Sequence, residues 1–149
     1  LDQFLGFLPK GWRFGVEIRN RHFLHADYFD VLRRHGVAHI YNSWTAMPPV
    51  TEQLAMPGSQ TCAEFSGARL LLKPGRKYEE AVTLFSPYTE IKEPYPEACQ
   101  AAAKLVRHGV SSAGRTKVFI YVNNRLEGNA LESICVIFAN LLDGSPSQP

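Results

Sequence analysis

Short apolar runs alternate with amphipathic segments along most of this chain. Four runs rich in β-branched and aromatic residues predict buried parallel strands near residues 13–19, 37–41, 68–73 and 117–122. A spacing of three or four between apolar positions predicts helices near residues 25–35 and 78–85, from Pro96 to Gly109, and after Asn129. This order is typical of right-handed βαβ units, so we predict an α/β fold with a mostly parallel sheet.

Two of the predicted helix ends carry recognisable capping residues. Gly36 follows the first helix, where a residue in the left-handed conformation commonly ends a helix. Asn129 and Glu132 have the spacing of a capping box before the last helix. That helix is expected to bury one broad apolar stripe, made of Leu131, Ile134, Cys135, Phe138, Leu141 and Leu142.

Polar residues follow directly where three of the predicted strands stop. In chain order, the stops contain Glu17 and Arg19, then Asn42, Ser43 and Trp44, then Asn123, Asn124 and Arg125. In parallel sheets and barrels, ligand-binding groups gather at the carboxyl ends of the strands. We therefore expect a site at this edge of the sheet, although these residues alone do not name a reaction.

Composition narrows the class of protein. With 45% hydrophobic and 20% charged residues in 149, the chain is expected to form one globular domain over residues 1–143, with a disordered Ser/Pro-rich tail at 144–149. The sequence contains no apolar run of membrane-spanning length and no leader pattern, so we predict a soluble cytoplasmic protein without membrane contact. Three widely separated cysteines fit a reducing compartment and small buried side chains. A net charge of +2 does not by itself indicate nucleic-acid binding.

Four blocks of the chain together resemble one protein family, the YecE-like proteins, also called domain of unknown function 72. The blocks are Phe14–Asn20, Tyr41–Thr45, Leu70–Arg76 and Val122–Ala130. The first and last are similar to the family's Glu-x-Arg strand and its Asn-Asn…Glu-Gly-x-Ala strand exit, and the Asn-Ser-Trp block is similar to one subgroup. The resemblance covers roughly residues 4–143.

The resemblance implies a TIM-barrel-like fold. Family members are longer than this chain, and their Gly-Thr-Ser-Gly-Trp segment has no match here. On that basis the chain is expected to be the carboxyl-terminal half of a (β/α)8-type barrel, with open strand edges available for self-association. The family name records that no activity is settled.

Glu17 and Arg19 are the candidate catalytic residues. Their spacing of two places both side chains on the same side of a strand. A carboxylate beside a guanidinium can act as a general base or accept a sugar hydroxyl, while the guanidinium holds an anion. The alternative is a structural ion pair that joins two strand ends.

The other candidates are ligand-binding residues, and each has a structural alternative. Asn42, Ser43 and Trp44 offer an amide, a hydroxyl and an indole face, or else a turn and a core side chain. Lys73 and Arg76 form a basic turn that would contact phosphate or remain solvated. The remaining candidates either contact a ligand or shape the turn before the last helix, and they are Asn123, Asn124 and Arg125.

No cofactor is named by these residues, and no metal site is predicted, because the histidines lack a metal-ligand spacing. His39, inside an apolar run, is expected in the core; a metal site combining Glu17, His39 and further strands stays open at this point. Two functions are compared. One is a barrel enzyme acting on a phosphorylated sugar or a nucleic-acid sugar, and the other is a noncatalytic module that binds nucleic acid through an Arg-rich edge and Trp44. A truncated fragment without activity is the third reading.

Overall fold

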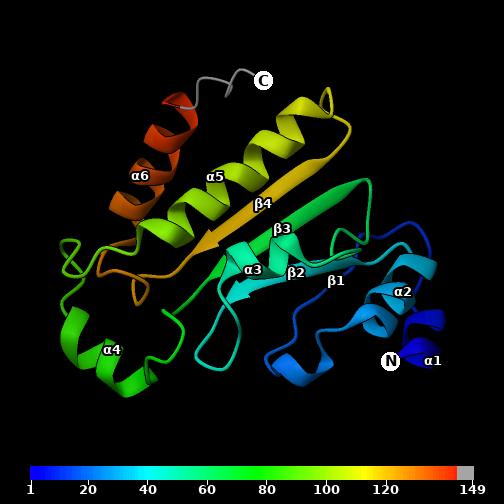
Figure 1. Ribbon diagram of the computed structural model, residues 1–149, viewed down its shortest axis with the longest axis horizontal. Helices are drawn as coiled ribbons and strands as arrows, with labels where there is room; N and C mark the ends of the chain where they lie inside the picture. Colours follow the sequence, from blue (N-terminus) through cyan, green and yellow to red (C-terminus); the bar gives the residue numbers. More distant parts are fainter. Residues whose placement is uncertain (144–149) are drawn as a thin grey trace.

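Four parallel strands form one sheet in the computed structural model, which describes residues 1–143 (Figure 1). The strands follow the chain in the spatial order β1-β2-β3-β4, and each pairs with its neighbour in parallel. The elements, in chain order, are α1 (Asp2–Gly6), β1 (Gly15–Val16), η1 (Arg21–Phe23), α2 (Ala26–Arg34), β2 (Ala38–Ser43), α3 (Val50–Ala55), β3 (Phe65–Leu70), α4 (Tyr78–Phe85), α5 (Pro96–Ser111), β4 (Lys117–Val122) and α6 (Ala130–Leu142).

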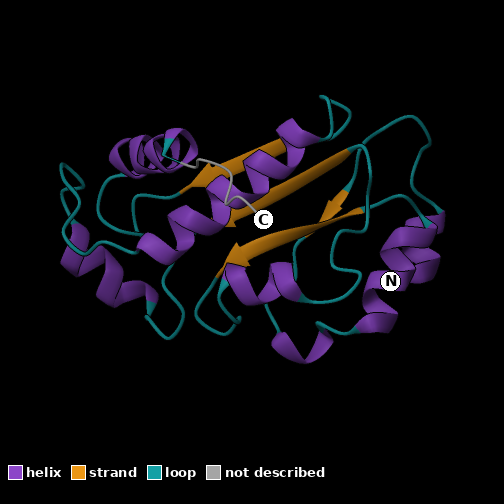
Figure 2. Ribbon diagram, turned by 45° about the horizontal axis from the view of Figure 1, so that its top comes forward, coloured by secondary structure: helices purple, strands orange, loops and turns teal. Residues whose placement is uncertain are grey.

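The predicted α/β fold is confirmed, and the sheet is not closed within the described residues. Helices α2, α3, α5 and α6 pack on one face of the sheet, and both views draw α3 and α5 on the same side of the strands (Figures 1 and 2). With strands in sequential order and helices on one side, the arrangement fits part of a barrel. The predicted tail at 144–149 lies outside the described residues, and the single-domain assignment stays a prediction.

Two helices show why these residues form these elements. In α2, Tyr28, Phe29 and Leu32 face the core, and Gly36 has a φ of 64°, which confirms the predicted left-handed residue after the helix. In α5, Pro96 begins the helix and a stripe of buried alanines brings it close to β3 and β4. A Cβ on Gly109 would lie 2.4 Å from Cγ2 of Val118, so only glycine permits this approach.

Two strand predictions need correction. The strand predicted at 68–73 runs from Phe65 to Leu70, since Phe65–Leu70 pairs with β4 over its whole length. The next amides, of Leu71 and Leu72, instead donate to the carbonyl of Ser43. The strand predicted at 13–19 forms ladder pairs only at Gly15 and Val16.

The prediction that α6 buries one broad apolar stripe is wrong. Ile137 and Ser133 are the buried residues of this helix, whereas Leu131, Phe138 and Leu142 are 74%, 61% and 87% exposed. Cys135, predicted to be a buried side chain, is also exposed, while Cys62 and Cys99 are buried as expected. The helix turns only a narrow part of its apolar surface toward α5 and β4.

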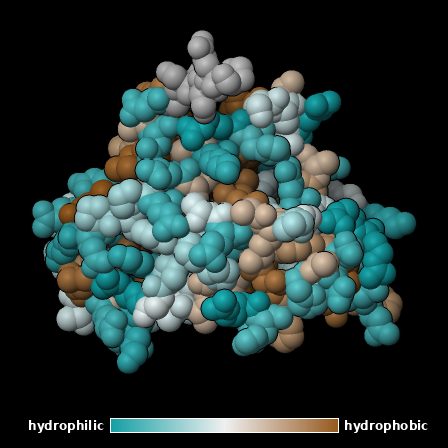
Figure 3. All heavy atoms as spheres, viewed as in Figure 1, coloured by the Kyte–Doolittle hydropathy of each residue, from teal (hydrophilic) through white to brown (hydrophobic). Residues whose placement is uncertain are grey.

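The helix-covered face of the molecule is mainly hydrophilic, with hydrophobic residues in small groups (Figure 3). Within residues 1–143, none of the helices combines the length and apolar content needed to cross a bilayer. The cytoplasmic location stays a prediction.

Candidate functional site

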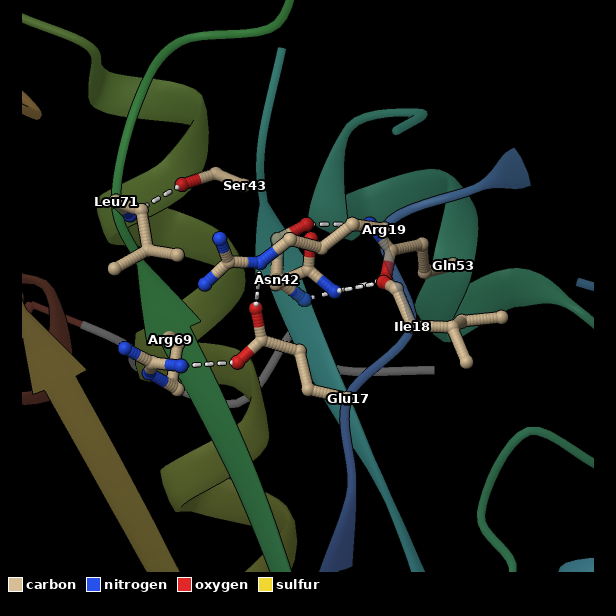
Figure 4. Close-up of polar contacts among 8 residues, drawn as sticks. All are labelled: Glu17, Ile18, Arg19, Asn42, Ser43, Gln53, Arg69 and Leu71. Carbon is tan, nitrogen blue, oxygen red and sulfur yellow. Dashed lines mark hydrogen bonds and ion pairs between the residues drawn. The ribbon is translucent and has the colours of Figure 1, made fainter. Parts of the chain in front are cut away.

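A carboxylate held between two arginines lies at the carboxyl ends of β1 and β3. Glu17, whose side chain is 12% exposed, accepts a hydrogen bond from Nε of Arg19 at 2.9 Å through Oε1 and one from Nη1 of Arg69 through Oε2 (Figure 4). Arg19 and Arg69 are each more than 40% exposed. The carboxylate therefore fixes two guanidinium groups whose remaining N–H groups reach solvent.

Asn42 and Ser43 are buried and tie neighbouring segments together. Nδ2 of Asn42 donates to the carbonyl of Ile18 at 2.9 Å, and Oγ of Ser43 accepts from the amide of Leu71 at 2.9 Å (Figure 4). Gln53 of α3 closes this network: its Nε2 donates to the carbonyl of Asn42 at 2.6 Å, and its Oε1 accepts from the amide of Asn42 at 3.2 Å. These bonds hold strand ends in place, and Oδ1 of Asn42 has no partner among the described residues.

Trp44 links the carboxyl edge to α4. The guanidinium carbon of Arg19 lies 4.2 Å from the centre of the Trp44 ring. Trp44 is half-buried and also packs against the cluster of Leu72, Ala81 and Phe85. Because Arg19 covers the ring at cation–π distance, the indole is partnered within the chain rather than standing as an open stacking surface.

The basic turn after β3 is neutralised in part by one glutamate. Nη2 of Arg76 lies 2.6 Å from both carboxylate oxygens of Glu93, and Nζ of Lys73 lies 3.3 Å from Oε1. Burial pushes the pKa of Glu93 upward, but the hydrogen bonds from Lys73 and Arg76 outweigh it, so the pKa lies below its ordinary value. Together, Lys73, Arg76 and Glu93 carry a net positive charge beside the candidate site.

The residues after β4 mainly shape the turn before α6. Oδ1 of Asn123 accepts from the amide of Arg125 at 3.0 Å, and Oδ1 of Asn124 accepts from the amide of Ala130 at 2.8 Å. The guanidinium carbon of Arg125 lies 4.6 Å from the centre of the Tyr78 ring. Through their Oδ1 atoms, Asn123 and Asn124 thus shape the turn before α6, which was the structural alternative to ligand binding.

Only half of the predicted capping box forms. Oδ1 of Asn129 accepts from the amides of Leu131 and Glu132, as an N-cap should. Oε2 of Glu132 instead accepts from the amide of Ile91 at 2.9 Å, so this carboxylate fixes the loop before α5 rather than the start of α6.

Sequence reasoning missed Arg69 and gave too little weight to Glu127. Arg69 lies in an apolar run, but its alternation with Ala68 and Leu70 could have shown that it faces the other side of the sheet from them. Glu127 is 2% exposed and accepts from the amide of Tyr95, from Oγ of Ser133 and from Sγ of Cys99, the last at 3.6 Å. Tyr95 and Cys99 lie 32 and 28 positions away in the sequence, so no local pattern indicates them, whereas Ser133 lies only six positions away.

His39 lies on the opposite face of the sheet from Glu17, so a metal site that combines the two is ruled out. The register pairs His39 with Val16 and Ala38 with Gly15, and the His39 ring packs among Tyr28, Phe29 and Tyr41. Burial lowers the pKa of His39 to about 4, and the nearby Gln53 side chain, which favours the protonated ring, opposes this effect only in small part. Residues 1–143 contain no group of three or more His, Cys, Asp or Glu side chains placed to hold a metal ion.

The arginines crowded into the first quarter of the chain do not form a free basic edge. Arg33 pairs with Asp30, Arg34 with Asp2 and Arg13 with Glu64. These three pairs neutralise much of the positive charge in this part of the chain.

An open pocket joins the paired charges to an apolar surface. It has a volume of about 400 Å³, and Glu17 and Arg69 line it together with Ile40, Phe119 and Tyr121. A larger hollow of about 910 Å³ continues toward the amino ends of the strands. The candidate site therefore has charged groups at one end and an aromatic floor.

Comparison with known proteins places the chain in a family and supports its fold. The family described as "Protein of unknown function DUF72" matches residues 1–148, so the chain belongs to that family. A crystal structure of a DUF72 family protein from Enterococcus faecalis is similar with a TM-score of 0.60 and 13% identity, covering 94% of this chain and 52% of that one. A DUF72 family protein from Thermotoga maritima is similar with a TM-score of 0.50 and 15% identity, covering 90% and 47%. No curated protein matches.

The family resemblance seen in the sequence is thus confirmed. At these identities the two structures support the fold alone, and the chain spans about half the length of each. The assignment to the carboxyl-terminal half of a barrel stays a prediction.

Proposed function

We propose that this chain binds a phosphate-bearing sugar at the carboxyl edge of its sheet. The observation that carries the proposal is the pair of arginines fixed on Glu17 beside an open pocket. A guanidinium presents several N–H donors in a planar fork that matches the oxygens of a phosphate. Arg19 and Arg69 therefore form the phosphate-binding part of the proposed site.

The charge at this edge favours an anion. Five cations accompany three carboxylates at the strand ends, so the net charge there is positive. The carboxylates are Glu17, Glu93 and the buried Glu127, and the cations are Arg19, Arg69, Lys73, Arg76 and Arg125. A pocket of about 400 Å³ is in the range that holds a small ligand. Phe119 and Tyr121 supply the apolar wall against which a sugar ring can pack.

A catalytic role for Glu17 stays a prediction. Both of its carboxylate oxygens already accept N–H groups from arginine. Each oxygen keeps a second lone pair, so Glu17 can act as a general base where a ligand hydroxyl reaches that lone pair beside the arginine. Turnover of a sugar phosphate that is lost in Glu17→Gln while binding persists would support this role.

The binding proposal is tested by calorimetric titration with ribose 5-phosphate, using ribose as the uncharged comparison. We expect the phosphate ester alone to bind, and Arg69→Gln and Arg19→Gln each to weaken it about tenfold or more, since each removes a charged hydrogen bond. Arg115→Gln is the matched control, because Arg115 lies before β4 at the opposite end of the sheet and donates to the carbonyl of Ser112. Equal affinities of all three variants would contradict the proposal.

The nucleic-acid alternative is separated by its dependence on salt. A single-stranded oligonucleotide that contacts several phosphates loses affinity steeply as salt rises, whereas one phosphate ester responds weakly. Tight oligonucleotide binding with a steep salt slope, together with no binding of ribose 5-phosphate, would favour the nucleic-acid module.

A further inference from the structure

A second cluster of cations lies beside the proposed phosphate site, at the exits of β3 and β4. Nζ of Lys73 and Nη2 of Arg76 lie 3.3 Å and 2.6 Å from the same carboxylate oxygen of Glu93. Arg125 follows β4, where the amide of Asn123 donates to the last residue of β3 at 2.9 Å and so keeps the two strand exits together. These three cations form the second cluster, and the two arginines of the proposed phosphate site form the first.

The two clusters are anchored to consecutive residues. The guanidinium carbon of Arg19, in the first cluster, lies 4.2 Å from the centre of the Trp44 ring. The next residue, Thr45, donates from Oγ1 to the carbonyl of Arg76 at 2.5 Å. Trp44 also packs against the apolar group that contains Phe85, and the guanidinium carbon of Arg76 lies 5.5 Å from the centre of the Phe85 ring. The clusters are therefore neighbours, joined by one continuous set of contacts.

Aromatic rings also fix the other two cations of the second cluster. Nζ of Lys73 lies 5.6 Å from the centre of the Tyr95 ring, and the guanidinium carbon of Arg125 lies 4.6 Å from the centre of the Tyr78 ring. Tyr78 begins α4, which lies beyond the carboxyl ends of β3 and β4 (Figure 1). Because a ring attracts a cation without taking up its hydrogen-bond donors, these cations are positioned and can still bind an anion.

The segment that carries Glu93 is held by the turn after β4. The amides of Lys92 and Glu93 both donate to the carbonyl of Glu127, at 2.9 Å and 3.2 Å. A Cβ on Gly128 would collide with the carbonyl oxygen of Glu90, so the two segments pack backbone to backbone. The carboxylate at the centre of the second cluster is thus fixed before a ligand arrives, which lowers the entropy cost of binding.

The second cluster has donors that the described chain does not use. Nε of Arg76 is buried and has no acceptor among residues 1–143. Arg125 contacts an aromatic ring and forms an ion pair with none of the carboxylates in the same range. Glu93 is the carboxylate that contacts the cluster, and it pairs with two of the three cations. An anion can therefore be bound without breaking these ion pairs.

Nearby carboxylates lower the positive charge and restrict where an anion can bind. Counting Glu93 and the buried Glu127 against the three cations leaves a net charge of +1. Glu79 and Glu80 of α4 line a separate hollow together with Arg76, and they would repel an anion there. Since the other two cations do not line that hollow, an anion is expected on their side of the cluster.

We propose that the second cluster binds a second phosphate of the same ligand, so that this edge of the sheet takes a sugar with two phosphate groups. The inference rests on the proposed function, because the first cluster must hold the other phosphate. Lys73 lies four residues after Arg69, and four extended residues span at most about 13 Å, a gap that long cationic side chains and a small sugar can bridge. Each phosphate then has its own cluster of charged donors.

Calorimetric titration with ribulose 5-phosphate and ribulose 1,5-bisphosphate tests the proposal, because these ligands differ only in the second phosphate. We expect the wild-type chain to bind the bisphosphate at least about tenfold more tightly, since the second phosphate adds charged hydrogen bonds. Lys73→Gln and Arg125→Gln should each remove most of this preference and leave the affinity for the monophosphate nearly unchanged. Lys117→Gln is the matched control and should keep the preference, because Lys117 is exposed at the amino end of β4.

The outcomes separate this inference from the proposed function. Equal affinity of the wild-type chain for the two ligands would overturn the inference and leave the proposed function standing. Failure of both ligands to bind would overturn both. A preference that survives Lys73→Gln and Arg125→Gln would place the second phosphate outside the second cluster, and so overturn the assignment. Monophosphate binding by each variant shows that the variant is folded.

A further titration with thymidine 3′,5′-bisphosphate distinguishes two sources of such a ligand. This nucleotide carries two phosphates on one sugar, as a unit of a nucleic-acid strand does, and thymidine 5′-monophosphate is its comparison. Binding weaker than that of ribulose 1,5-bisphosphate supports a free sugar bisphosphate as the ligand. Tighter binding that is lost in Lys73→Gln and Arg125→Gln supports the second cluster and assigns its ligand to a nucleotide.

Discussion

The two faces of the sheet use polar residues in different ways. On the helix-covered face and beneath the helices, His39 and Glu127 are each 2% exposed and bonded to groups from distant segments. On the open face, Glu17 and Arg69 form an ion pair at the rim of a pocket. Buried polar groups are costly unless partnered, whereas charged groups at a rim keep much of their hydration.

The two glutamates show the difference most directly. Glu127 follows β4 and joins the start of α5 to α6 through an amide, a hydroxyl and a thiol, with no cation in contact among residues 1–143. Glu17 follows β1 and contacts two arginines that remain partly exposed. Replacing the first should therefore act on stability, and replacing the second mainly on ligand binding.

The largest effect is expected for Glu127→Ala. The change leaves the amide of Tyr95 without an acceptor in the core and restricts the hydroxyl of Ser133 to the carbonyl of Asn129. It also leaves a cavity, and we expect a loss of about 3 kcal/mol or more in the free energy of unfolding. Urea unfolding followed by circular dichroism measures it. Glu132→Ala is the control on the neighbouring helix, and its exposed bond to Ile91 should contribute about 1 kcal/mol or less. Equal losses for the two glutamates would remove the distinction between buried and exposed carboxylates.

The sequence predicted the order of elements better than their exact bounds. β4 and α4 lie at the predicted residues, since each has a strong pattern bounded by turn residues. β3 begins three residues earlier than predicted, because Ser66 and Gly67 have loop-like propensities that pairing with β2 and β4 overrides. Pairing partners far apart in the sequence leave no local signal.

The candidate site was also predictable only in part, because its distant partners leave no local signal in the sequence. The polar stop after each strand indicated the edge where Glu17, Arg19 and Trp44 come together. The partners of these residues were not indicated, since the contact from Arg69 to Glu17 spans 52 positions in sequence. The apolar stripe of α6 was visible, but a pattern does not tell whether the surface that covers it belongs to the same chain.

His39 gives the next largest effect, as a dependence of stability on pH. Its pKa of about 4 in the folded chain lies below the value of about 6.5 in the unfolded chain. The unfolded chain therefore binds the proton first as pH falls, so the contribution of His39 is complete above about pH 6.5 and is lost progressively between 6.5 and 4. The loss amounts to at most about 3 kcal/mol.

His39→Phe isolates this contribution. Phenylalanine keeps an aromatic ring among Tyr28, Phe29 and Tyr41, and the hydroxyl of Tyr28 still reaches the carbonyl of Val16 at 3.3 Å. Urea unfolding at several pH values from 7.5 to 4.5 should give a shallower slope for the variant than for the wild type. Parallel curves would assign the acid sensitivity to other groups, such as Asp2 and Glu93, whose pKa values are lowered.

The smallest effect on stability is expected for Glu17→Gln. The change keeps the shape of the side chain and removes its charge, so the ion pairs with Arg19 and Arg69 are lost. Both arginines are more than 40% exposed, so the pairs contribute about 1 kcal/mol or less, and the difference from wild type should shrink between about 0.05 and 0.5 M NaCl. Urea unfolding at the two salt concentrations measures it. A loss as large as that of Glu127→Ala and independent of salt would contradict this contrast between the two faces. It would mean that Glu17 is as fully removed from water as Glu127, because only a desolvated carboxylate escapes screening by salt and costs that much to replace.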